Sequence, residues 1–204
     1  MAEWKFGAGK GYQNVLFLTF GTGLGCGMIL NGKLYAGTND NAGEVGHLHL
    51  SEFGPVGYGK IGSFEGFCSG SGIVQLATAL IKAEKQMGRN VSWCDINNLN
   101  NLTARDVAEA ARMGDTVALK AFSISSRKLG AGLSLLIDIL DPEIIVLGGI
   151  YMRCESLIYP TMMQVIREET LPLVANAVQI KPAKLGEKIG DYAALSVALT
   201  NSNC

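Results

Sequence analysis

Apolar runs separated by glycine-rich turns dominate the first part of the chain. Residues 15–20 form a β-branched and aromatic run that stops at a glycine, which predicts a buried strand. A second strand is expected over 26–30, and the Asn-Gly pair at 31–32 predicts a tight hairpin into a returning strand over 33–35. The weak alternation of residues 47–50 indicates a third antiparallel strand.

Helical periodicity follows after a predicted loop. Glycine and proline are frequent in residues 51–63, which predicts irregular structure there. Beyond this loop, apolar residues recur every three or four positions between capping residues and glycines. We expect helices over 73–87, 103–114, 115–140, 157–170 and 191–200, and strands over 143–147 and 178–180. Along the chain, the predicted strands come first, and strands then alternate with helices. This order indicates one α/β unit with a mixed sheet flanked by helices.

Composition narrows the class of protein. Of 204 residues, 48% are apolar and 17% are charged, which excludes a disordered chain. The formal net charge of −1 offers no basic surface, so nucleic acid is not expected as a partner. Because the apolar stretches are short and no signal peptide is apparent, we expect a cytoplasmic protein without a membrane partner. A reducing compartment is also indicated by an odd number of scattered cysteines without a C-x-x-C pair: Cys26, Cys68, Cys94, Cys154 and Cys204.

Two glycine-rich turns follow predicted strands. Gly21, Thr22 and Gly23 combine free backbone N–H groups with a hydroxyl, which suits anionic oxygens, although a plain tight hairpin has the same pattern. Gly148 and Gly149 would let a flat ligand or a phosphate approach the end of a strand, or form a simple turn into a helix. A P-loop is excluded at the first turn because no Lys-Ser/Thr follows it.

Three polar residues are candidates for binding a polyol. Glu44 and His47 lie three positions apart among glycines, where a carboxylate and an imidazole can hydrogen-bond hydroxyl groups. A structural histidine is the alternative for His47. Glu65 precedes a predicted helix and would be a second binding carboxylate, or a solvated group that complements the helix dipole.

Taken in order, these segments resemble the ROK sugar kinases and repressors of the actin-like ATPase superfamily, over effectively the whole chain. Residues 18–27 are similar to the family's second phosphate motif and 42–47 to its E-x-G-H sugar signature. The resemblance implies a ribonuclease H-like lobe that serves ATP-dependent hexose phosphorylation, glucokinase- or fructokinase-like, with ATP and Mg²⁺ as cofactors. It implies sugar binding by Glu44, His47 and Glu65, and ATP or phosphate binding by Gly21, Thr22, Gly23, Gly148 and Gly149.

The chain departs from the family at its zinc loop. Where the family's motif has three cysteines, this sequence has Val56, Tyr58 and Ser63, none of which supplies a thiolate. His47, which matches the fourth ligand of that motif, cannot hold a structural zinc alone. We therefore expect a zinc-free variant in which the packing of Val56, Tyr58 and Phe64 orders the loop.

A second departure concerns catalysis. Neither the family's D-x-G-x-T phosphate loop nor its catalytic N-D pair is found at the matching place, so residues 1–204 resemble a single C-terminal lobe without the N-terminal phosphate-loop lobe. The general-base aspartate is expected upstream of Met1, and the chain alone is expected to be inactive. The body of a sugar-sensing transcriptional regulator and an inactive remnant are the alternatives. A homodimer is expected, because the apolar helix over 115–140 would expose a large surface.

Overall fold

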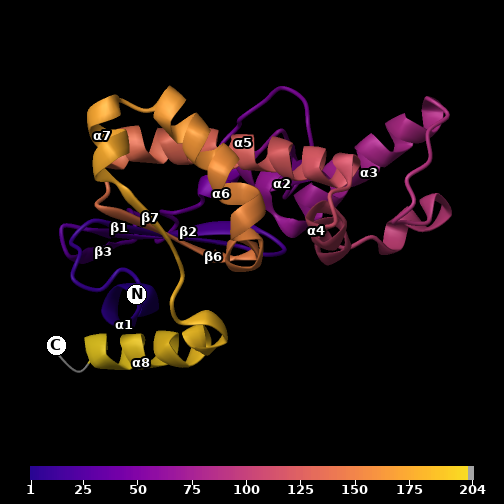
Figure 1. Ribbon diagram of the computed structural model, residues 1–204. Helices are drawn as coiled ribbons and strands as arrows, with labels where there is room; N and C mark the ends of the chain where they lie inside the picture. The colour runs from indigo at the N-terminus through magenta and orange to yellow at the C-terminus, as the bar shows by residue number, and fades with distance from the viewer. Residues whose placement is uncertain (202–204) are drawn as a thin grey trace.

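A mixed sheet of five strands forms the centre of the fold (Figure 1). The computed structural model describes residues 1–201, and the strand order is β3-β2-β1-β6-β7. The strands are β1 (Val15–Phe20), β2 (Leu24–Leu30), β3 (Lys33–Tyr35), β6 (Ile144–Gly149) and β7 (Gln179–Pro182), with β4 (Val56–Gly57) and β5 (Lys60–Ile61) as a separate hairpin. The mixed α/β sheet flanked by helices is confirmed.

Helices cover both faces of this sheet. They are α1 (Ala2–Phe6), α2 (Phe64–Cys68), α3 (Gly70–Gln86), α4 (Ala104–Arg112), α5 (Thr116–Leu140), α6 (Ile150–Glu169), α7 (Pro172–Ala177) and α8 (Ile189–Asn201), with 3-10 turns η1 (Val45–His47), η2 (Ile96–Asn101) and η3 (Gly186–Lys188). Figure 1 shows α5, α6 and α7 on one face, and α1 with α8 on the other. Because side chains alternate along a strand, Leu16 and Leu18 join the large core cluster while Val15 joins the smaller one.

The central pair of strands brings two chain turns together. β1 pairs with β2 antiparallel and with β6 parallel, and Phe20 is opposite Gly149 in the parallel register. The carboxyl ends of β1 and β6 therefore lie side by side. Open α/β sheets bind ligands beyond such strand ends, so this edge is the natural place for a site.

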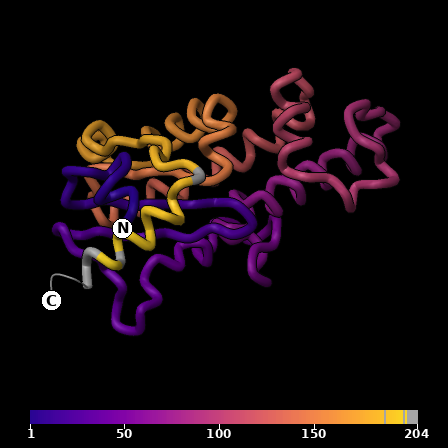
Figure 2. The backbone as a smooth tube through the Cα atoms, turned by 90° about the horizontal axis from the view of Figure 1, so that it is seen from below, coloured from indigo at the N-terminus to yellow at the C-terminus, as the bar shows by residue number. Residues whose placement is uncertain are grey.

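The segment from α3 to α4 projects from one end of the sheet in both Figure 1 and Figure 2, and α2 packs between this segment and the sheet. Its helices begin at residues whose side chains cap free N–H groups. The Ser69 hydroxyl accepts from Gly72 N, and Thr103 and Asp106 form a reciprocal capping box at the start of α4. Asp115 caps α5 by accepting from two N–H groups, so the expected helix starts at Thr103 and Asp115 are confirmed. Helix α3 begins at Gly70, three residues before the expected start.

Some expected elements differ from the structure. The strand expected over 47–50 is wrong, because the chain forms η1 there and His49 makes a single bridge to Ser63. The loop over 51–63 contains the β4–β5 hairpin, which has too few residues to show alternation. Helix α6 begins at Ile150, directly after the Gly149 turn, rather than at residue 157.

Exposure of the long helix α5 is smaller than expected. Most of its apolar side chains are buried, and three large ones are exposed: Leu119, Leu135 and Ile139. The homodimer stays a prediction. None of the helices in residues 1–201 has the length and apolar character needed to cross a membrane. The cysteines at 26, 68, 94 and 154 are free thiols, and Cys204 lies outside the described residues.

Candidate functional site

The turn between β1 and β2 is held by the start of α3. Gly21 O accepts from Gly70 N at 2.7 Å, and the Ser71 hydroxyl lies 3.4 Å from Thr22 O, to which it donates. Gly21 N donates to Gly23 O across the turn at 3.0 Å. The Thr22 side chain stays exposed, so its hydroxyl is free to meet a ligand.

An open groove of about 690 Å³ lies beside this turn. Gly21 and Thr22 line one part of it, while Gly149 and Ile150 at the start of α6 line another. Gly149 has no side chain to cap α6, so the first N–H groups of this helix remain available at its positive end. The structure thus brings three of the expected phosphate-binding residues to one groove.

Gly148 takes a different place from its neighbour. It is buried and lines a separate cavity of about 390 Å³ together with Thr19 and Gly186. Gly149 lines both cavities, and its φ of 68° is one that L side chains rarely adopt. The paired glycines therefore separate two spaces at the carboxyl end of β6.

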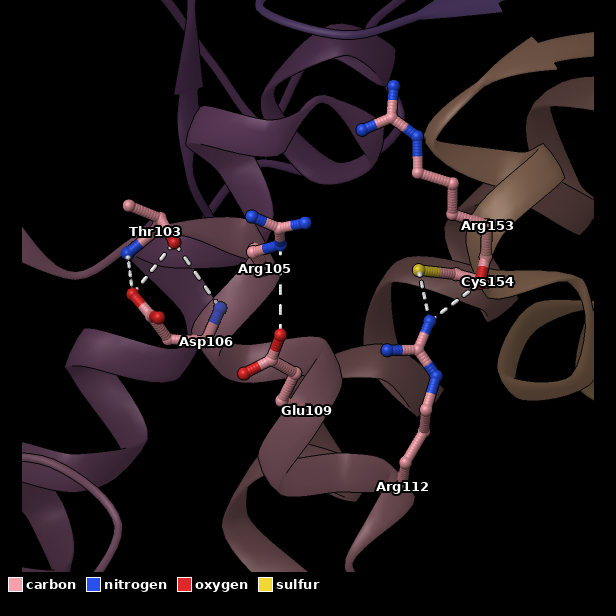
Figure 3. A network of polar contacts seen from close by, with 7 residues as sticks. All are labelled: Thr103, Arg105, Asp106, Glu109, Arg112, Arg153 and Cys154. Atoms are coloured by element: carbon pink, nitrogen blue, oxygen red, sulfur yellow. Dashed lines mark hydrogen bonds and ion pairs between the residues drawn. The ribbon is translucent and has the colours of Figure 1, made fainter. Parts of the chain in front are cut away.

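Arg153 is a groove residue that the sequence motifs did not single out. It lines the groove, the Gly148 cavity and a third cavity of about 310 Å³ between α4 and α6. In Figure 3 its guanidinium extends away from Cys154, while Arg112 donates to the Arg153 carbonyl oxygen at 2.6 Å. Among the side chains that the structure describes, no carboxylate forms an ion pair with Arg153. The groove therefore presents one cation, and no Asp or Glu lines it.

Glu65 connects the expected sugar residues to the glycine-rich turn. Its Oε2 accepts from Leu24 N at 2.9 Å, and a Cβ added at Gly23 would lie 2.8 Å from the same oxygen. A Cβ added at Gly46 would lie 3.3 Å from Glu65 Cβ, so the segment around Glu44 and His47 packs against this residue as well. Glu65 is therefore more than a solvated group at a helix start.

The segment that carries Glu44 and His47 is tied to β2. Cys26 N donates to Gly43 O at 3.0 Å, and at a φ of 102° a side chain on Gly43 would collide with the Cys26 carbonyl oxygen. Glu44 and His47 both have exposed side chains. The His47 ring contacts the Tyr58 ring, with centroids 5.2 Å apart. Both side chains are therefore accessible to a ligand.

The three positions matched to zinc cysteines have unequal environments. Val56 and Tyr58 are 41% and 85% exposed, so the expectation that their packing orders the loop is wrong, whereas Phe64 is fully buried as expected. Ser63 is buried and caps α2 by accepting from Gly66 N at 3.0 Å. Gln75 of α3 fixes the hairpin through two hydrogen bonds of 2.9 Å with the Val56 backbone. Polar contacts from helices thus replace the packing we expected.

We predict that metal analysis of the purified chain will find no stoichiometric zinc. Among the side chains that the structure describes, no three from His, Cys, Asp or Glu gather where they could hold a metal ion. A structural zinc site needs four such ligands, and Val56, Tyr58 and Ser63 supply none. About one zinc per chain that survives dialysis, measured by atomic emission, would contradict this prediction.

Comparison with known proteins decides the family. The model of the ROK family matches residues 1–201. The chain belongs to the ROK family. A glucokinase of Halalkalibacterium halodurans is 34% identical over 92% of this chain and 56% of its own length. A xylose repressor of Caldicellulosiruptor bescii is 28% identical over 92% of this chain and 46% of its own length.

Solved structures of ROK proteins share the fold. A ROK glucokinase from Streptomyces griseus, in complex with glucose and AMPPNP, superposes with a TM-score of 0.79 at 31% identity over 96% of this chain and 64% of that chain. The fold is that of a ROK protein of the actin-like ATPase type. This chain spans about half the length of the curated ROK relatives it matches, which include kinases and a repressor.

Proposed function

We propose that the ROK protein to which this chain belongs transfers a phosphoryl group from ATP to a hexose. The observation that carries this proposal is the contact of Glu65 with the glycine-rich turn. Phosphoryl transfer needs the acceptor hydroxyl next to the terminal phosphate, and catalysis depends largely on such positioning. Glu65, the carboxylate proposed to bind the sugar, is hydrogen-bonded at the end of the glycine-rich turn proposed to bind the phosphates. This arrangement meets the requirement.

Most of the expected residues have a role in this proposal, whereas Gly23 and Gly148 do not line the groove and have none. The Thr22 hydroxyl and the first N–H groups of α6, directly after Gly149, bind the phosphate tail of ATP in the groove. Gly21 lets the phosphates approach the turn closely because it has no side chain. Glu44, His47 and Glu65 hydrogen-bond the sugar hydroxyls, each contact to a charged group being worth roughly 1.5–3 kcal/mol. Mg²⁺ enters with the nucleotide, because no carboxylate among the described side chains lines the groove.

The general base lies outside this set. In the proposal Glu44 and Glu65 bind hydroxyls that do not react, and the aspartate that would accept the proton is expected upstream of Met1, in another lobe. Loss of a general base typically lowers the rate by roughly 10²- to 10⁴-fold. Negligible turnover is therefore expected from residues 1–204 by themselves, which we regard as one C-terminal lobe.

Binding measurements separate the kinase from its alternatives. We would titrate the chain by calorimetry with glucose, fructose, mannose and N-acetylglucosamine, with and without AMPPNP and Mg²⁺. The kinase proposal expects both a hexose and AMPPNP to bind, with AMPPNP weakened by Thr22→Val. Hexose binding without nucleotide binding would favour the regulator, in line with the similarity to a xylose repressor. Binding of neither at millimolar concentration would indicate an inactive remnant.

A neutral side chain at Arg153 is expected to weaken AMPPNP binding by roughly 10- to 100-fold, because a charged hydrogen bond to phosphate is lost. Arg153→Met tests this by calorimetry. Arg105→Met is the matched control: Arg105 lines the cavity between α4 and α6 together with Arg153 but does not line the groove. Equal affinities of Arg153→Met and the unaltered chain for AMPPNP would exclude this role, while hexose affinity should stay unchanged.

A further inference from the structure

His47 and Tyr58 are in direct contact as rings. Their centroids are 5.2 Å apart and their planes meet at 85°, which is a favourable perpendicular arrangement for aromatic rings. His47 is exposed, and no residue in 1–201 hydrogen-bonds its imidazole. The contact with Tyr58 is therefore the one ring contact or hydrogen bond that the described residues make with the imidazole.

The turn conformation does not explain a tyrosine at position 58. Tyr58 and Gly59 form the two-residue connection between β4 and β5, with φ values of 45° and 76°. Asn31 and Gly32 form the equivalent connection between β2 and β3, with φ values of 51° and 70°. Positive φ at both positions favours Asn-Gly, and a bulky residue is rare there.

Burial does not explain this tyrosine either. Tyr58 is 85% exposed. Among the described residues, Tyr58 makes one aromatic ring contact, which is with His47. The contact with His47 therefore explains why an aromatic side chain occupies a position with a left-handed backbone conformation.

The hairpin that carries Tyr58 is fixed to both parts of the proposed sugar site. Lys60 Nζ donates to His47 O at 2.6 Å. On the other side, Gly57 packs against α2, where an added Cβ would lie 2.5 Å from Gly66 N, next to Glu65. Tyr58 is thus held at a defined distance from both His47 and the helix of Glu65.

We propose that Tyr58 is a positioning residue whose ring holds the His47 imidazole in the orientation that binds a hexose hydroxyl. The inference rests on the proposed function of His47 as a sugar ligand. It adds that a ring–ring contact limits the orientation of this ligand and so raises the affinity for the sugar. Without the contact, the imidazole rotates among several conformers and only a fraction of the molecules has the binding orientation.

The first test is an NMR measurement on the ligand-free chain. The protein has two histidines, so His49→Gln assigns the His47 imidazole signals. Tyr58→Asn should move these signals toward the positions of a free imidazole, because the ring current of Tyr58 is removed. The variant keeps the hairpin, since Asn-Gly is the preferred pair for this turn. Tyr58→Phe and the exposed control Phe53→Ala should leave the His47 signals near their original positions. Unmoved signals in Tyr58→Asn would overturn the inference.

The second test compares affinities for the hexose that binds best in the titrations above. Tyr58→Asn is expected to lower this affinity by about two- to tenfold, the range of an aromatic pair contact, and Tyr58→Phe should restore it. AMPPNP affinity should not change in either variant. If His47→Ala loses hexose affinity and Tyr58→Asn does not, the inference is wrong while the proposed function stands. If His47→Ala binds the hexose normally, the proposed role of His47 fails and the inference fails with it.

Discussion

Replacing Gly149 with alanine is expected to destabilise the protein by about 3 kcal/mol or more. Gly149 has φ 68° and ψ −125°, a conformation for which an L side chain is strained, and an added Cβ would collide with the Phe20 carbonyl oxygen. The collision involves backbone on both sides, so the ends of β1 and β6 would have to separate. Thermal unfolding should show a fall in Tm of roughly 6–12 °C for a chain of this size.

Gly190→Ala is the matched control for this prediction. Gly190 lies in α8, and a Cβ added there meets no heavy atom within 4 Å. Because alanine is a better helix former than glycine, its Tm should stay the same or rise slightly. A Gly149→Ala protein with the Tm and the AMPPNP affinity of the unaltered chain would show that β1 and β6 do not approach each other as described.

Replacing Glu65 with glutamine is expected to lower hexose affinity by roughly 10- to 100-fold while leaving the fold almost unchanged. The amide oxygen of glutamine can still accept from Leu24 N, as Glu65 Oε2 does at 2.9 Å. The substitution removes the charge that strengthens hydrogen bonds to sugar hydroxyls and replaces one acceptor oxygen with an NH2 donor. Calorimetry for the hexose, together with thermal unfolding, measures the two effects separately.

Two further variants define the effect of Glu65. Glu65→Ala removes the acceptor for Leu24 N, so it should also lower the stability by about 1–3 kcal/mol. Glu52→Ala removes an exposed carboxylate from the neighbouring loop and should change neither quantity. Normal hexose affinity in Glu65→Gln, with AMPPNP still bound, would remove Glu65 from the sugar site.

Local sequence determined the elements whose signals are strong within a few residues. The apolar run of β1 has the bounds expected from it, residues 15–20. The Asn31-Gly32 hairpin and the start of α5 after Asp115 also follow their local chemistry, since positive φ favours Asn-Gly and an aspartate caps free N–H groups. The order of the motifs was enough to indicate the ROK family.

Only the tertiary structure decided how these motifs meet. The Tyr58-Gly59 hairpin has no local signal, because a tyrosine disfavours the left-handed conformation that its surroundings impose. Arg153 lines the groove because the parallel pairing of β1 and β6 places the start of α6 beside Thr22. Glu65 and Leu24 are 41 positions apart in sequence, and their hydrogen bond depends on the packing of α2 against β2. Such contacts arise because apolar surfaces that are far apart in the sequence are buried against each other. No short stretch of sequence specifies this packing.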